Sequence, residues 1–167
     1  MHRQWTHACR AAGCALLLSL FATVAHAEVF RAGEVQVEQP WSQELPPNAP
    51  TVAVYFVIRN QSMNGEQLVA ADTPIAGQAQ LHQHLSQDGM MKMQQLQAVT
   101  IPPSGRAVFA PMAFHVMLLD IRDRSVLLEG QHFPLTLHFA NAGAMTVQVE
   151  VLRQAPAAES STQHEGH

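Results

Sequence analysis

Residues 79–93, AQLHQHLSQDGMMKM, are two alternating segments joined by Asp88-Gly89. An Asp-Gly pair between such segments is a strong signal for a two-residue hairpin, because both central positions of a type I′ turn need positive φ. If these two residues form the turn, Gln87 pairs with Met90 and the chain folds back on itself as two antiparallel strands. A longer loop would shift this pairing.

The predicted register places two kinds of metal-binding side chain on one face of the hairpin. Counting back from the turn sets His84 opposite Met93 and Ser86 opposite Met91. Side chains alternate between the two faces of a strand, so four of them share one face: His82, His84, Met91 and Met93. His82 is then diagonal to Met93 and within side-chain reach of it.

Outside the hairpin, the apolar residues also come in short alternating or β-branched runs separated by Gly, Pro, Asn and Asp. No long stretch has helical periodicity, and turn signals recur about every ten residues. The predicted strands are 35–39, 51–60, 67–72, 79–86, 90–99, 107–109, 115–120, 133–139 and 145–152. We therefore expect an all-β fold, a Greek-key β-sandwich or barrel.

The first residues of the chain predict export. Arg3 and Arg10 precede an apolar run, 11–25, which ends in the small-x-small sequence Ala25-His26-Ala27, the pattern of a secretory signal peptide. The run is shorter than the roughly twenty residues that a membrane-spanning helix needs. We expect residues 1–27 to be removed and the mature protein to be soluble in the periplasm.

The predicted mature chain has no cysteine, because Cys9 and Cys14 both lie in this leader. Disulfides, thiolate catalysis, iron–sulfur clusters and cysteine-based copper sites are therefore excluded for it. A lipoprotein anchor at Cys14 is disfavoured, since the apolar run follows this cysteine instead of preceding it. We expect one β-barrel domain, 28–154, and a disordered histidine-containing tail, 155–167, which has almost no large apolar residue.

The charge of the mature chain argues against nucleic acid as a partner. Without Arg3 and Arg10, seven basic residues face thirteen acidic ones, a formal charge of −6, whereas nucleic-acid-binding surfaces are basic. Seven of the ten histidines and seven of the eight methionines remain after residue 27. An excess of these donors without cysteine indicates handling of a soft metal.

Four donors carry the functional prediction: His82, then ten residues, Met93, then twenty-one residues, His115, one residue, and Met117. Cu(I) is a soft d¹⁰ ion that prefers thioether and imidazole ligands in three- or four-coordinate sites. Thioethers need no deprotonation and are not lost to disulfides in an oxidising compartment. We therefore predict a Cu(I) site with these four ligands. Zinc fits less well, because it rarely takes a thioether ligand.

Each of these residues also has an ordinary structural explanation. Methionine commonly fills a core, and a strand histidine is commonly a half-buried polar residue. The combination is more informative, because a specified pattern of four such residues recurs by chance in about one chain in a thousand of this size. The candidate additional ligands are His84 and Met91 on the hairpin and His164 and His167 in the tail, where Cu(II) is the expected ion.

The chain resembles the periplasmic copper chaperones of the PCu(A)C type, whose pattern of His, ten residues, Met, twenty-one residues and His-x-Met it matches. The likeness extends over about residues 33–152 and includes the segments QPW (39–41), AQLHQHLSQDGMMKM (79–93), IPPSG (101–105), FHVMLL (114–119) and FPLTLHF (133–139). Two positions depart from the family pattern. Gln43 replaces a common arginine, and His84 replaces a frequent methionine, which would tilt the site toward Cu(II).

This resemblance implies a cupredoxin-like fold and delivery of Cu(I), by ligand exchange, to the CuA centre of cytochrome c oxidase subunit II or to another copper protein. We expect a monomeric carrier and not an enzyme. Copper scavenging, storage or resistance is an alternative function, and a metal-free β-sandwich interaction module is an alternative of another class. A copper-dependent oxidase stays open, whereas an electron-transfer cupredoxin needs a cysteine ligand, which the mature chain lacks.

Overall fold

The computed structural model of the chain describes residues 28–87 and 89–156. These residues form eleven strands and no helix. The strands are β1 (Val29–Ala32), β2 (Val35–Gln43), β3 (Thr51–Asn60), β4 (Glu66–Asp72), β5 (Ala76–Gln87), β6 (Met90–Leu96), β7 (Val99–Ile101), β8 (Arg106–Phe109), β9 (Phe114–Ile121), β10 (His132–Phe139) and β11 (Gly143–Leu152). The predicted all-β class is confirmed.

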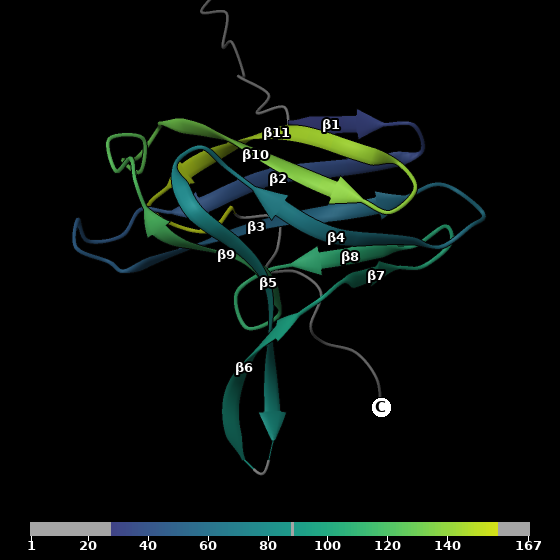
Figure 1. Ribbon diagram of the computed structural model, residues 1–167, viewed down its shortest axis with the longest axis horizontal. Helices are drawn as coiled ribbons and strands as arrows, with labels where there is room; N and C mark the ends of the chain where they lie inside the picture. Colours follow the sequence, from purple (N-terminus) through teal and green to yellow (C-terminus); the bar gives the residue numbers. More distant parts are fainter. Residues whose placement is uncertain (1–27, 88, 157–167) are drawn as a thin grey trace, which may run out of the picture.

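The strands are hydrogen-bonded in the order β6-β5-β9-β8-β3-β2-β11-β10-β4-β7, with β1 paired to β2 and a further pairing of β9 with β3. Figure 1 shows this path folded over on itself, with β1, β2, β10 and β11 toward one side of the body and β7, β8 and β9 toward the other. Among the described residues the two end strands, β6 and β7, do not pair. The fold is therefore the predicted β-sandwich in an open form, and not a closed barrel.

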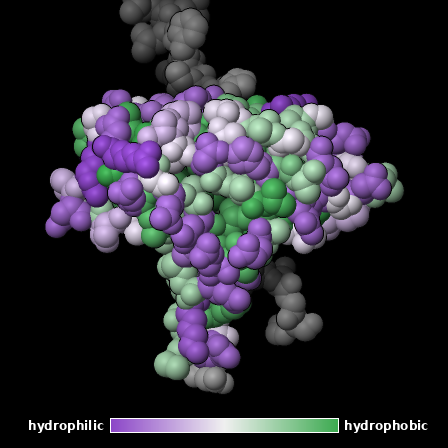
Figure 2. All heavy atoms as spheres, in the orientation of Figure 1, coloured by the Kyte–Doolittle hydropathy of each residue, from purple (hydrophilic) through white to green (hydrophobic). Residues whose placement is uncertain are grey.

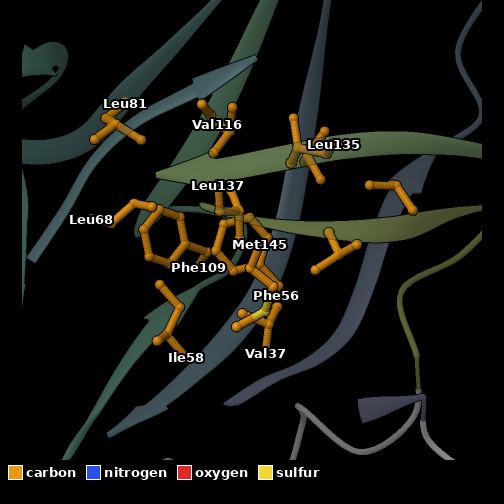
Figure 3. Close-up of a cluster of buried hydrophobic side chains, with 14 of the residues drawn as sticks. Val37, Phe56, Ile58, Leu68, Leu81, Phe109, Val116, Leu135, Leu137 and Met145 are labelled. Atoms are coloured by element: carbon orange, nitrogen blue, oxygen red, sulfur yellow. The ribbon is translucent and has the colours of Figure 1, made fainter. Parts of the chain in front are cut away.

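Side chains from both layers fill the space between them. β3 alternates strictly between buried and half-exposed positions, so Val52, Val54, Phe56 and Ile58 point inward. Phe56 stacks on Phe109 of β8 with ring centroids 4.4 Å apart, within the cluster that Figure 3 shows. Full burial of one such side chain stabilises the fold by roughly 1.5–3 kcal/mol, so this core fixes the strands that border the site.

β2 continues past the predicted end at residue 39, through Pro40 to Gln43. Proline has no N–H for a ladder bond and normally ends a central strand. Here the pairing with β3 is irregular between Glu38 and Trp41, and Gln39 adopts a φ of 49°. This bulge places Pro40 where no ladder donor is needed, and pairing resumes beyond it.

The hairpin of β5 and β6 projects away from the body (Figures 1 and 2). β5 pairs with β9 as far as Gln83, and with β6 from Leu81 to Gln87, so the strand beyond His84 is held by β6 alone. The predicted single strand 90–99 is wrong, because β6 ends at Leu96 and β7 pairs with β4 instead. β7 is a separate strand because its Val99 and Ile101 are buried in the core, whereas nearly all of β6 is exposed.

Candidate metal centre

β5 lies between β6 and β9 and carries the two histidines of the hairpin. Its register with β6 sets His84 opposite Met93 and Ser86 opposite Met91. Gly89 has a φ of 75°, as the predicted turn requires. The pairing that we predicted from the sequence of this hairpin is confirmed.

The register of β5 with β9 adds the second half of the predicted pattern. His82 lies directly opposite His115, and Gln80 lies opposite Met117. Opposite residues point to the same side of a sheet. One face of the three strands, which we call the donor face, therefore carries His82, His84, Met91, Met93, His115 and Met117.

The three imidazole rings of the donor face lie side by side. The ring centroid of His115 is 5.7 Å from that of His82 and 5.0 Å from that of His84. His115 is only 2% exposed, and the other two are half-buried. One nitrogen of each ring is buried without a hydrogen-bond partner: Nδ1 of His82, Nδ1 of His84 and Nε2 of His115. Buried polar atoms nearly always have a partner, so these nitrogens are suited to an external ligand.

A chain of two amides fixes which nitrogen of His82 is free. The Nε2 of Gln80 donates to Oε1 of Gln78 at 3.0 Å, which turns the Oε1 of Gln80 toward His82. This oxygen lies 3.0 Å from Nε2 of His82 and can only accept, so Nε2 carries the ring hydrogen. The lone pair is then on Nδ1, the nitrogen that has no partner.

His115 is held in the opposite tautomer. Its Nδ1 lies 3.3 Å from the backbone carbonyl oxygen of Ala113, which can only accept. Nδ1 therefore carries the hydrogen, and the lone pair is on the buried Nε2. Each of the two histidines of the predicted pattern thus presents a basic nitrogen while the protein holds the other one, as second-shell partners do in metal sites.

Both histidines are suited to stay neutral. Burial, together with the nearby His84, lowers the pKa of His82. Burial also lowers the pKa of His115, assisted by the charges of His84 and His82 and opposed by the bond to Ala113. A neutral imidazole is the form that binds metal. At neutral pH, protons therefore compete little with a metal ion for these two nitrogens.

Two aromatic rings border the donor face on the side of β3. Tyr55 has its ring centroid 6.5 Å from that of His115 and 4.8 Å from that of Trp41. Burial raises the pKa of the Tyr55 phenol, and the indole nitrogen of Trp41 is a donor without a lone pair for metal. Tyr55 therefore lies beside His115 as a neutral phenol, with Trp41 packed against Tyr55.

The methionines of the donor face differ in exposure along it. Met117 is half-buried, whereas Met93 and Met91 on β6 are 49% and 51% exposed. Among the described residues, no three His, Cys, Asp or Glu side chains form a group able to hold a metal ion. A metal that takes more than two ligands from this face would therefore need methionine sulfur, which favours a soft ion.

A family model describes most of the chain. The model named LpqE-like, "Putative lipoprotein LpqE-like", matches residues 35–151. The chain belongs to the LpqE-like family. One curated relative, "Putative lipoprotein Lxx21020" of Leifsonia xyli subsp. xyli (strain CTCB07), is 26% identical over 122 residues, which are 72% of this chain and 71% of the relative.

The fold of this LpqE-like protein is that of solved PCuAC domains. The apo PCuAC domain from PmoF1 is 25% identical with a TM-score of 0.64, over 77% of this chain and 100% of that domain. The copper-bound PCuAC domain from PmoF2 is 22% identical with a TM-score of 0.65, over 76% and 99%. Cu(I)-loaded DR1885 from Deinococcus radiodurans is 25% identical with a TM-score of 0.58, over 78% and 83%. The predicted relationship to the PCu(A)C type, and its cupredoxin-like β-sandwich, are confirmed.

Several predicted features of this LpqE-like protein lie outside the described residues, namely the signal peptide (1–27), including Cys14, and the tail histidines His164 and His167. Within the described ranges, no helix is both long and apolar enough to traverse a membrane. Gln80, which holds Nε2 of His82, was not predicted from the sequence. Its position two residues before His82, on the same face, was the available signal. The nearness of Tyr55 had no local signal, because β3 is distant in sequence.

Proposed function

We propose that this protein is an exported Cu(I) carrier of the copper-chaperone type. It holds one ion on the donor face through Nδ1 of His82, Nε2 of His115 and the sulfur atoms of Met93 and Met117. The observation that carries the proposal is the pair of buried lone pairs on two opposed imidazoles, with methionines on both flanking strands. Cu(I) accepts this mixed donor set without strong angular demands.

A solved relative supports the choice of ion. DR1885 from Deinococcus radiodurans, 25% identical to this chain, has a structure with Cu(I) bound. The chain has no cysteine after residue 27, which fits a carrier that must release its cargo. Thioether and imidazole ligands are neutral, so they attract a copper ion less strongly than negatively charged thiolates do.

Transfer would proceed by ligand exchange, with no bond of a substrate made or broken. An acceptor ligand approaches from the exposed side of Met93, binds the ion, and displaces one thioether. The remaining donors then leave in turn, with the buried His115 last. The proposed acceptor is the CuA centre of cytochrome c oxidase subunit II or another exported copper protein, and the protein itself is not an enzyme.

The ligand set is tested by anaerobic competition titration with a Cu(I)-selective chelator. The unchanged protein should bind one Cu(I) tightly. His115→Ala and Met93→Ala should each weaken binding by about tenfold or more, the scale of roughly 1.4 kcal/mol or more per lost ligand. His132→Ala is the control, because this exposed residue of β10 is outside the donor face. Equal affinities for all four proteins would refute the proposed site.

The carrier role is tested by mixing Cu(I)-loaded protein with the apo soluble domain of subunit II and counting copper on each after separation. Movement of copper to the acceptor supports delivery. Retention of copper favours the storage or scavenging alternative. A melting temperature that does not change with Cu(I) would instead favour the metal-free interaction module, since a ligand that binds the native state stabilises it.

The proposed location is the periplasm. Sequencing of the processed protein should give an N-terminus at Glu28 if residues 1–27 are a cleaved signal peptide. The names of the family and of its curated relative contain the word lipoprotein. Mass spectrometry that finds lipid on Cys14 would refute processing at Glu28.

A further inference from the structure

The donor face extends beyond the four proposed ligands, toward the tip of the hairpin. His84 and Met91 lie on the same face. His84 is two residues beyond His82 along β5, and Met91 pairs with Ser86, four residues beyond His82. Exposure rises in the same direction, from 2% at His115 to half-exposed at His84 and 51% at Met91. The face is therefore a row of soft donors that begins in solvent and ends in the body.

We propose that His84 and Met91 form an outer Cu(I) position, which the ion occupies transiently on its way to and from the inner ligands. This inference rests on the proposed function. Met93 would be shared by both positions, because it lies opposite His84 and diagonal to His82 and to Ser86, the partner of Met91. The shared ligand lets the ion move inward without being released.

The independent observation at the outer position is the unpartnered nitrogen of His84. Its Nδ1 is buried and has no hydrogen bond, although the tip of the hairpin around it is exposed. The strand is fixed here by the bond from the N–H of His84 to the carbonyl oxygen of Ala113 at 3.2 Å. The ring is thus held 5.0 Å from that of His115, and side chains on diagonal rungs such as that of Met91 are within reach.

The hairpin supplies a matched control for Met91. Met90 is the adjacent residue, has the same side chain, and is 59% exposed against 51% for Met91. It points to the opposite face, because neighbouring residues of a strand alternate. Met→Leu keeps nearly the same volume and apolar character but removes the sulfur. The two leucine variants therefore differ only in the face that loses a thioether.

The experiment measures exchange of Cu(I) between the protein and bicinchoninate by stopped-flow absorbance, without oxygen and in both directions. Met91→Leu should slow loading and unloading by the same factor, about fivefold or more. The outer position is empty at equilibrium, so losing it changes both rates but not their ratio, which is the equilibrium affinity. Met90→Leu should exchange like the unchanged protein. A second variant, His84→Ala, should slow exchange as Met91→Leu does.

Equal exchange rates for Met91→Leu and Met90→Leu would overturn the outer position while leaving the proposed function intact. A drop in equilibrium affinity for Met91→Leu as large as that for Met93→Leu would also overturn it, because Met91 would then be an inner ligand. Failure of the unchanged protein to bind Cu(I) would refute the proposed function itself, and the inference with it.

Discussion

Two polar clusters lie within this sandwich, and they satisfy their polar atoms in opposite ways. The carboxylate of Glu66, 5% exposed, accepts hydrogen bonds from backbone N–H groups of Gln67, Asn141 and Ala142 and from the side chain of Asn141, at 2.8–3.1 Å. Burial raises its pKa, but these bonds outweigh burial and lower the pKa overall. On the donor face, by contrast, three imidazoles each keep a buried nitrogen without a partner.

The contrast separates a structural cluster from a binding cluster. At Glu66 the protein supplies every donor itself, so the cluster ties β4 to the turn between β10 and β11 and needs nothing from outside. On the donor face the protein holds one nitrogen of His82 and one of His115 and leaves the other free. An unsatisfied buried acceptor costs about 1–3 kcal/mol, a cost that a bound ion would remove.

The largest expected effect is on the structural cluster. Glu66→Ala should lower the free energy of unfolding by about 2–3 kcal/mol, because it removes the charged acceptor of the hydrogen bonds that join β4 to this turn. Urea denaturation at pH 7 measures this loss, and Cu(I) affinity should stay within about twofold of the original. A loss of stability below about 1 kcal/mol, or a clear loss of affinity, would contradict the separation of the two clusters.

A smaller effect is expected from pH on the donor face. The pKa values of His82 and His115 lie below the ordinary 6.5. Cu(I) affinity should therefore be nearly constant from pH 8 to about 6.5, and should fall only at lower pH, by about tenfold for each unit below the pKa of a protonating ligand. Competition titrations across this range measure it, with His132→Ala as control. A decline that begins above pH 7 would show the opposite sign of the pKa shifts.

The smallest effect is on the stability of the metal-free protein. His115→Leu replaces the ring with an apolar side chain. It removes the buried Nε2, which has no partner, and also the Nδ1 donor to Ala113, whose carbonyl oxygen still accepts from the N–H of His84. The free energy of unfolding without copper should stay the same or rise by up to about 1 kcal/mol, while stabilisation by Cu(I) is reduced. Melting curves with and without Cu(I) test both parts. A loss of about 2 kcal/mol or more would mean that His115 serves the fold, as Glu66 does.

Local patterns were sufficient where neighbours in sequence are also neighbours in space. The register of the hairpin followed from Asp88-Gly89, because a two-residue turn allows one pairing only. Pattern was insufficient where a strand changes partners. Residues 90–99 look like one continuous strand in the sequence, yet the chain stops pairing with β5 after Leu96 and pairs with β4 from Val99. The cause is the burial of Val99 and Ile101 in the core. The strand predicted for 35–39 continues to Gln43 because a bulge with β3, which has no local signal, accommodates Pro40.

The sequence by itself determined the β class, the hairpin and the chemical identity of the donors, because alternation, turn residues and ligand softness are properties of short segments. Only the tertiary structure decided that His82 lies opposite His115, and that Gln80 and Ala113 leave one lone pair on each ring. These depend on the pairing of β5 with β9, whose histidines are thirty-three positions apart in the chain. Register between such distant strands depends on how their apolar faces pack together in the folded core, which no short segment shows by itself.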